Sequence, residues 1–120
     1  MEKNIQEALN EIMELDGVIS AALVDSESGM ILGNIGSGVD IELAAAGNTE
    51  VVRAKLKTIR SLNLNDRIED MLITLGKQYH IIRPLSSDTG VFLYIVLDRA
   101  HSNLALARRK AHDVDDKLSL

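Results

Sequence analysis

The chain has 120 residues, a length that fits one domain with a single core. Its formal net charge of −5 argues against nucleic acid and anionic membranes as main partners. It has no cysteine, which excludes thiol catalysis, disulfides and cysteine-ligated zinc, and no apolar run approaches the ~20 residues that span a bilayer. We therefore expect one cytoplasmic domain over residues 1–120.

The first third of the chain predicts a helix followed by a β-hairpin. Apolar residues recur at helical spacing between residues 2 and 14, and Gly17 is suited to end that helix in the left-handed conformation. A mostly apolar strand over 18–25 and a second strand over 30–35 follow, with turn-forming residues between them. Gly33 weakens the second strand, which favours an edge position in the sheet.

Residues 40–60 predict a long helix, because they contain no proline and Asp40 can cap the free backbone N–H groups at its start. At 100° per residue, the apolar side chains form two stripes instead of one. The first stripe suits the core of the domain and contains Ile41, Ala45, Val52, Leu56 and Ile59. The second, called the outer stripe below, consists mostly of smaller residues, namely Leu43, Gly47, Val51, Ala54 and Thr58.

The outer stripe predicts a contact with another protein chain, since a helix that lies on its own sheet needs only one apolar stripe. Gly47 favours this interpretation, because a glycine inside a helix costs about 1 kcal/mol relative to alanine and calls for a packing reason. In the alternative interpretation, one large core wraps two sides of the helix.

The second half of the chain predicts three strands and a final helix. The strand over 67–75 starts with Arg67, Glu69 and Asp70, charges of the kind that guard an exposed sheet edge. After a partner strand over 78–85, residues 91–97 are apolar without interruption and should lie in the centre of the sheet, covered on both faces. The last helix starts near residue 100. The element order is therefore α-β-β-α-β-β-β-α, an α+β fold with the long helix on one face and both terminal helices on the other.

Signals for catalysis and for metal or cofactor binding are weak. Gly33 and Gly38 have the spacing of a phosphate-binding loop, but the Lys-Ser/Thr pair that must follow is missing. His80 lies mid-strand and is interpreted as a half-buried structural histidine. Residues 112–116 could attract a divalent cation weakly, although a solvated helix end explains them better. We predict no catalytic, cofactor or metal site.

Short stretches at both ends of the chain form a recognisable pattern. The first part contains LDGV at 15–18, AALVD at 21–25 and SGMIL at 28–32, and the last part contains LDR at 97–99 and NLALAR at 103–108. This pattern resembles the roadblock/dynein light chain family, in particular its prokaryotic branch, over essentially the whole chain. The resemblance implies a five-stranded antiparallel sheet in the order 2-1-5-4-3, related to longin and profilin-like folds. That order agrees with the central position inferred for residues 91–97.

The resemblance also implies a homodimer in which the third strands of two copies pair and the long helices pack side by side. Such a dimer would cover the outer stripe and the edge of the strand over 67–75. A two-fold contact of this kind is self-complementary and would bury about 800 Å² per copy or more. The expected interface residues are Leu43, Gly47, Val51, Ala54, Thr58, Arg67, Glu69 and Met71.

In function, members of this family bind small Ras-like GTPases, and some bacterial members activate GTP hydrolysis by their partner. The resemblance therefore implies a non-catalytic homodimeric regulator or scaffold for a small GTPase, with or without GTPase-activating activity. The expected partner contacts occupy the arc of the long helix that the core and the dimer leave free: Glu42, Glu50, Arg53 and Lys57. A merely solvated face is the alternative for these four residues.

By the same resemblance, bacterial activators reposition the catalytic groups of the GTPase and donate no arginine. A donated arginine would accelerate hydrolysis by about 10³–10⁵, and Arg53 and Arg60 of the long helix are candidates for that role. Two other functions stay open. One is a structural adaptor subunit of a larger complex, and the other is a small-molecule sensor that encloses a ligand between sheet and helices.

Overall fold

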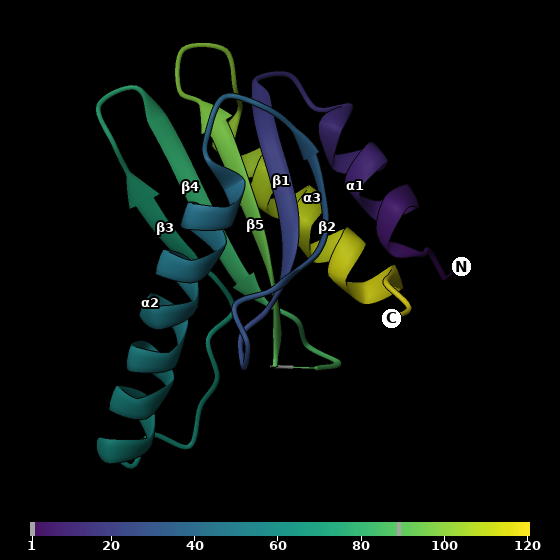
Figure 1. Ribbon diagram of the computed structural model, residues 1–120. Helices are drawn as coiled ribbons and strands as arrows, with labels where there is room; N and C mark the ends of the chain where they lie inside the picture. The colour runs from purple at the N-terminus through teal and green to yellow at the C-terminus, as the bar shows by residue number, and fades with distance from the viewer. Residues whose placement is uncertain (1, 89) are drawn as a thin grey trace.

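The computed structural model describes residues 2–88 and 90–120 (Figure 1). The five strands form one antiparallel sheet in the order β2-β1-β5-β4-β3. One face of the sheet carries α2 and the other carries α1 and α3 (Figure 1). The predicted element order, strand order and layers are confirmed. The elements are α1 (Ile5–Met13), β1 (Val18–Asp25), β2 (Ile31–Gly36), α2 (Ile41–Ser61), β3 (Met71–Thr74), β4 (Gln78–Pro84), β5 (Val91–Asp98) and α3 (Leu104–Lys117).

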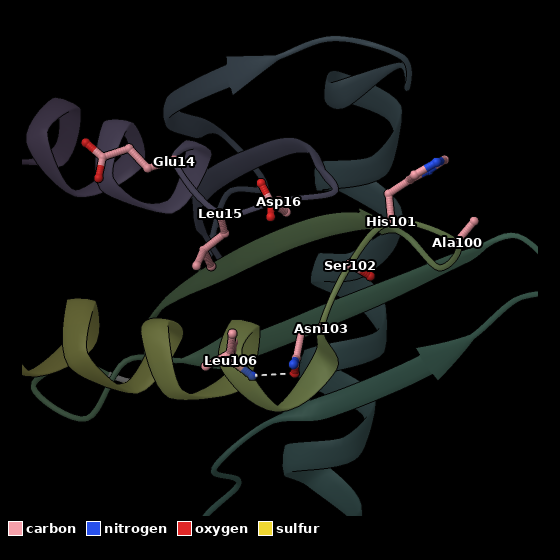
Figure 2. A pocket seen from close by; sticks show the side chains of 8 residues that line it. All are labelled: Glu14, Leu15, Asp16, Ala100, His101, Ser102, Asn103 and Leu106. Atoms are coloured by element: carbon pink, nitrogen blue, oxygen red, sulfur yellow. Dashed lines mark hydrogen bonds between the residues drawn. The ribbon is translucent and has the colours of Figure 1, made fainter.

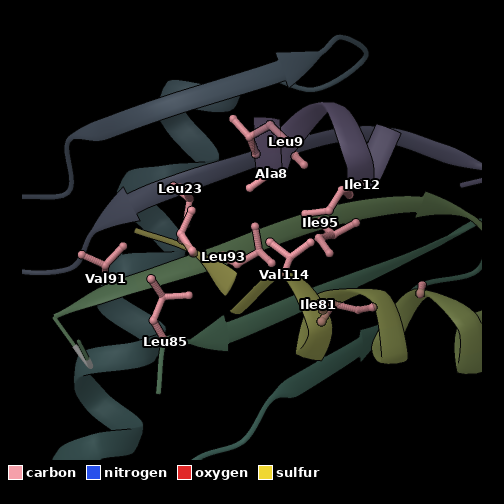
Figure 3. Close-up of a cluster of buried hydrophobic side chains, with 14 of the residues drawn as sticks. Ala8, Leu9, Ile12, Leu23, Ile81, Leu85, Val91, Leu93, Ile95 and Val114 are labelled. Carbon is pink, nitrogen blue, oxygen red and sulfur yellow. The ribbon is translucent and has the colours of Figure 1, made fainter. Parts of the chain in front are cut away.

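The central strand β5 supplies side chains to two separate cores. Its residues 91–97 are at most 6% exposed, which confirms the prediction that both faces are covered. Because successive side chains of a strand point to opposite faces, alternate residues join different clusters. Leu93, Ile95 and Leu97 pack under α1 and α3 (Figure 3), and Phe92, Tyr94 and Val96 pack under α2. Among the described residues, none of the helices combines the length and apolar character needed to cross a membrane.

Two glycines allow backbone segments to approach each other closely. Gly17 has a φ of +83°, and a Cβ there would lie 2.6 Å from Cβ of Ser102. The expectation that Gly17 caps the first helix is wrong, because the C-cap is Glu14 and Gly17 lies in the turn that follows. Gly33 does lie on an edge strand, and a Cβ there would lie 2.6 Å from Cγ2 of Ile5. The second glycine therefore makes room for α1 to sit directly on β2.

The third strand is shorter than predicted, because it begins at Met71 and not at residue 67. In the observed register Met71 pairs with Ile82, so an extension by two residues would place Glu69 opposite Pro84. Proline has no N–H to donate to a ladder. The N–H of Leu85 bonds to the Val91 carbonyl on β5 at 2.9 Å, so the missing N–H of its neighbour Pro84 lies on the β3 side. The ladder between β3 and β4 therefore ends at Met71.

The last helix also begins later than predicted, at Leu104 instead of near residue 100. Asn103 is its N-cap, and the side chain accepts a hydrogen bond from the Leu106 N–H at 3.1 Å. Ala100 belongs to the preceding turn, where its N–H donates to the Asp98 carboxylate at 3.1 Å. The local hydrogen-bonding side chains thus decide where this helix starts.

The interpretation of residues 112–116 as a solvated helix end is wrong for Asp115, which is 2% exposed. Its carboxylate accepts a hydrogen bond from Nε of Arg83 at 2.9 Å, and from the N–H and the hydroxyl of Ser86 at 3.0 and 3.1 Å. This buried ion pair ties the end of β4 to α3. His112 and Asp116 form a separate, exposed pair at 3.3 Å.

Candidate functional site

The inner side of α2 packs on the sheet as predicted. Asp40 caps the helix by accepting a hydrogen bond from the Leu43 N–H at 3.2 Å. Ala45 and Val52 are buried in the cluster under α2, and Ile41 and Leu56 pack against that cluster. The fifth residue of the first stripe, Ile59, is half-buried but lies outside the cluster. The last turn of α2 therefore contributes little to the core.

A chain of polar side chains lies on the face of the sheet that α2 covers. The Tyr94 hydroxyl on β5 lies 3.0 Å from Nδ1 of His80 on β4. Nε2 of His80 bonds to Oε1 of Gln78 at 2.8 Å. Burial lowers the pKa of His80 and raises the pKa of Tyr94. His80 is the half-buried structural histidine that the sequence predicts.

The outer stripe of α2 is not covered by the domain's own core. Leu43 is 70% exposed and Val51 is 42% exposed. Gly47, Ala54 and Thr58 are exposed as well, and a Cβ added at Gly47 would meet no atom within 4 Å. The alternative interpretation, in which one core wraps both stripes, is therefore wrong. The packing reason for Gly47 does not lie within this copy of the chain.

The predicted partner contacts, Glu42, Glu50, Arg53 and Lys57, are also exposed. Within the described parts of the chain, none of the four forms a salt bridge. The turn between β1 and β2 approaches the same flank of the helix, since a Cβ at Gly29 would lie 3.9 Å from Cα of Ala46. There a surface hollow of about 370 Å³ is lined by Gly29, Met30, Ile31 and Glu42.

The predicted interface residues near β3 separate into two groups. Met71 is half-buried in β3 and packs against the cluster under α2. Arg67 and Glu69 are exposed but precede the strand, so their expected place on its edge is wrong. Asp70 turns to α3, where its carboxylate binds the Arg108 guanidinium through two hydrogen bonds of 2.9 and 3.1 Å. In the described chain, β3 pairs only with β4, which leaves its other edge open.

Sequence reasoning missed two exposed leucines beside this surface. Leu62 and Leu64, which follow α2, are 61% and 53% exposed. The available signal in the sequence was the alternation of leucine with asparagine over residues 62–65. The exposed apolar surface at the end of α2 is therefore larger than the outer stripe alone.

A hollow on the opposite face of the sheet lies between the α1–β1 turn and the start of α3 (Figure 2). Its volume is about 470 Å³, and Glu14, Asp16 and His101 are among the residues that line it. Nδ1 of His101 lies 2.7 Å from the Asp98 carboxylate, and the Asn103 side chain caps α3. Over residues 2–88 and 90–120, no three His, Asp or Glu side chains are grouped so as to hold a metal ion.

Comparison with known proteins identifies the fold. Neither a family model nor a curated protein sequence matches the chain. Solved structures do match, at low sequence identity. A roadblock/LC7 domain from Streptomyces avermitilis is 11% identical, with a TM-score of 0.79 over 95% of this chain and 93% of that one. The gliding protein MglB from Thermus thermophilus is 14% identical, with a TM-score of 0.80 over 93% of this chain and 83% of that one.

A structure of MglB with a tetrameric arrangement is 15% identical, with a TM-score of 0.79 over 92% of this chain and 82% of that one. At identities this low, the similarity concerns the path of the backbone and not the side chains. It confirms, at the level of the fold, the resemblance seen in the sequence. The chain therefore has the roadblock/LC7 fold.

Proposed function

We propose that this protein is a non-catalytic, cytoplasmic homodimeric regulator or scaffold for a small Ras-like GTPase. The observation that carries the proposal is the outer stripe of α2, an exposed apolar surface on a roadblock/LC7 fold that its own core leaves uncovered. The structure of MglB with a tetrameric arrangement supports self-association of this fold.

The outer stripe is suited to an antiparallel contact with α2 of a second copy. A two-fold axis between Glu50 and Val51 would place Gly47 against Ala54 of the second copy, where both side chains are small. The same arrangement would set Leu43 against Thr58. The open edge of β3 would extend the contact.

The flank of α2 with Glu42, Glu50, Arg53 and Lys57 would then stay free for the GTPase. These side chains are exposed, and none of them is held by a salt bridge within the described residues. The hollow beside Glu42 and the exposed Met30 adjoin this flank. A partner that docks here would contact the helix and the β1–β2 turn together.

The small-molecule sensor is less well supported than the regulator. A ligand enclosed between sheet and α2 would need space and polar groups to orient it. That layer is filled by aliphatic and aromatic side chains, with Phe92, Tyr94 and Val96 at most 1% exposed. A structural adaptor uses the same surfaces as a regulator, so only dependence on nucleotide separates the two.

Affinity capture tests the proposal. The protein serves as bait in lysate of its source organism, in parallel with a non-hydrolysable GTP analogue and with GDP. A Ras-like GTPase enriched only with the analogue supports the regulator, and added protein should then change its hydrolysis rate if the protein is an activator. The same partners with both nucleotides would favour the structural adaptor instead.

A further inference from the structure

The second half of α2 and the residues after it carry a concentrated positive charge. Residues 51–65 contain Arg53, Lys55, Lys57 and Arg60 and no aspartate or glutamate, in a chain with a net charge of −5. All four cations are exposed. This run therefore differs in sign from the molecule as a whole.

Within the described residues, no cation of α2 forms a salt bridge, whereas Lys3, Arg83, Arg108 and Lys110 do. Five cations outside α2 in the described chain form none either, so the cations of α2 are distinguished by their clustering. Arg53 and Lys57 are four residues apart and Lys57 and Arg60 three apart, so like charges are neighbours on one side of the helix. The negative end of the helix dipole accounts for Arg60 in the last turn but not for Arg53, which lies two turns earlier.

The same three residues surround a depression in the surface. A hollow of about 320 Å³ is lined by Arg53, Ala54, Leu56, Lys57 and Arg60. Val52 is the last fully buried residue of α2, and the final turns extend beyond the ends of β3 and β4 in Figure 1. The cations thus lie on a projecting part of the helix that an incoming chain can reach.

We propose that Arg53, Lys57 and Arg60 form a docking site for an acidic segment of a partner protein. This proposal rests on the proposed role of α2 as the docking helix. It adds the chemical class of the partner segment and the direction in which that segment runs along α2. Arginine presents a planar fork of donors that matches a carboxylate. The three cations span about 10 Å along the helix axis, which matches acidic residues at positions i, i+3 and i+7 of a partner helix that runs antiparallel to α2.

A protein segment fits this site better than an anionic membrane. A bilayer surface extends across the whole molecule and meets its net charge of −5, which opposes binding. A peptide segment is influenced mainly by charges within a Debye length of about 8 Å. Within residues 51–65 those charges are positive, and the carboxylate of Glu50 lies one turn before Arg53 on the same side of α2.

The test is an NMR titration of the ¹⁵N-labelled full chain with a helical peptide of about 16 residues that carries glutamates at i, i+3 and i+7. The expected result is saturable shifts confined to the amides of residues 53–60. The double variant Arg53→Glu/Arg60→Glu should lower the affinity about tenfold or more. Lys55→Glu is the matched control, since Lys55 projects about 160° away around the helix, and it should lower the affinity less than twofold.

Absence of saturable shifts, or an equal loss of affinity in the Lys55→Glu variant, would overturn the proposal. If the protein sedimented with vesicles of equal parts phosphatidylcholine and phosphatidylserine but did not bind the peptide, the site would be assigned to lipid. That result would also overturn the proposal. A change of mass in the Arg53→Glu/Arg60→Glu variant would assign these residues to the contact between copies. The measurement needs neither GTPase nor nucleotide, so it can fail or succeed separately from the capture experiment.

Discussion

The Tyr94 hydroxyl lies 3.0 Å from Nδ1 of His80, with the two rings edge to face at 5.5 Å between centroids. Oε1 of Gln78 lies 2.8 Å from Nε2 on the other side of the ring, so each nitrogen of the imidazole has a hydrogen-bond partner. Tyr94 belongs to the hydrophobic cluster under α2, so His80 adjoins the layer beneath the helix that carries the proposed interface.

Acid should weaken the fold through His80. Burial lowers its pKa from 6.5, so the folded state binds fewer protons than the unfolded state as the pH falls. The stability that neutral His80 contributes is fully present above about pH 7. It is lost as the pH falls from the unfolded-state pKa of about 6.5 through the lower folded-state pKa. Urea midpoints at pH 7.5 and 5.5 should differ more for the wild type than for His80→Gln. Equal differences would show that His80 does not carry this dependence.

Removal of the Asp115 carboxylate should be strongly destabilising. Asp115→Ala leaves the Arg83 guanidinium buried without its partner, at a cost of about 3–5 kcal/mol in the free energy of unfolding. The matched control is the double variant Arg83→Met/Asp115→Leu, which removes both charges and should regain most of that loss. Urea unfolding measures both variants. A loss below about 1 kcal/mol for Asp115→Ala would mean that the pair is solvated in solution.

Two glycine-to-alanine changes should have opposite effects on stability. Gly33→Ala places a methyl group 2.6 Å from Ile5, so α1 must shift and the unfolding free energy should fall by about 1–2 kcal/mol. In a single copy, Gly47→Ala places a methyl group in open space on a helix, which should raise the unfolding free energy of the separated chain by about 1 kcal/mol. Thermal unfolding of dilute samples compares the two. A destabilised Gly47→Ala variant would indicate that the site is already filled in solution.

The sequence predicted most of the fold because two of its signals are local and strong. The uninterrupted apolar residues 91–97 identified the central strand, and the two stripes on residues 40–60 identified a helix with a core side and a free side. These two signals were sufficient to predict which helices cover which face of the sheet. The strand order came from the resemblance.

The remaining features depend on contacts between residues far apart in the chain. Asp115 is charged and sits at a helix end, and only its contact with Arg83, 32 residues away, explains its burial. The start of β3 is decided by Pro84 on the neighbouring strand, and Asp70 is drawn away from the sheet edge by Arg108. No pattern within residues 67–75 or 112–116 reports these partners.

The central claim is that the outer stripe of α2 joins two copies of this chain, and light scattering coupled to size-exclusion chromatography tests it most directly. The account predicts twice the chain mass of 13.1 kDa for the wild type. Gly47→Glu and Ala54→Arg each place a bulky charge where the two helices would touch, and both should reduce the mass to that of one chain. A monomeric wild type, or a dimeric mass that persists in both variants, would contradict the account.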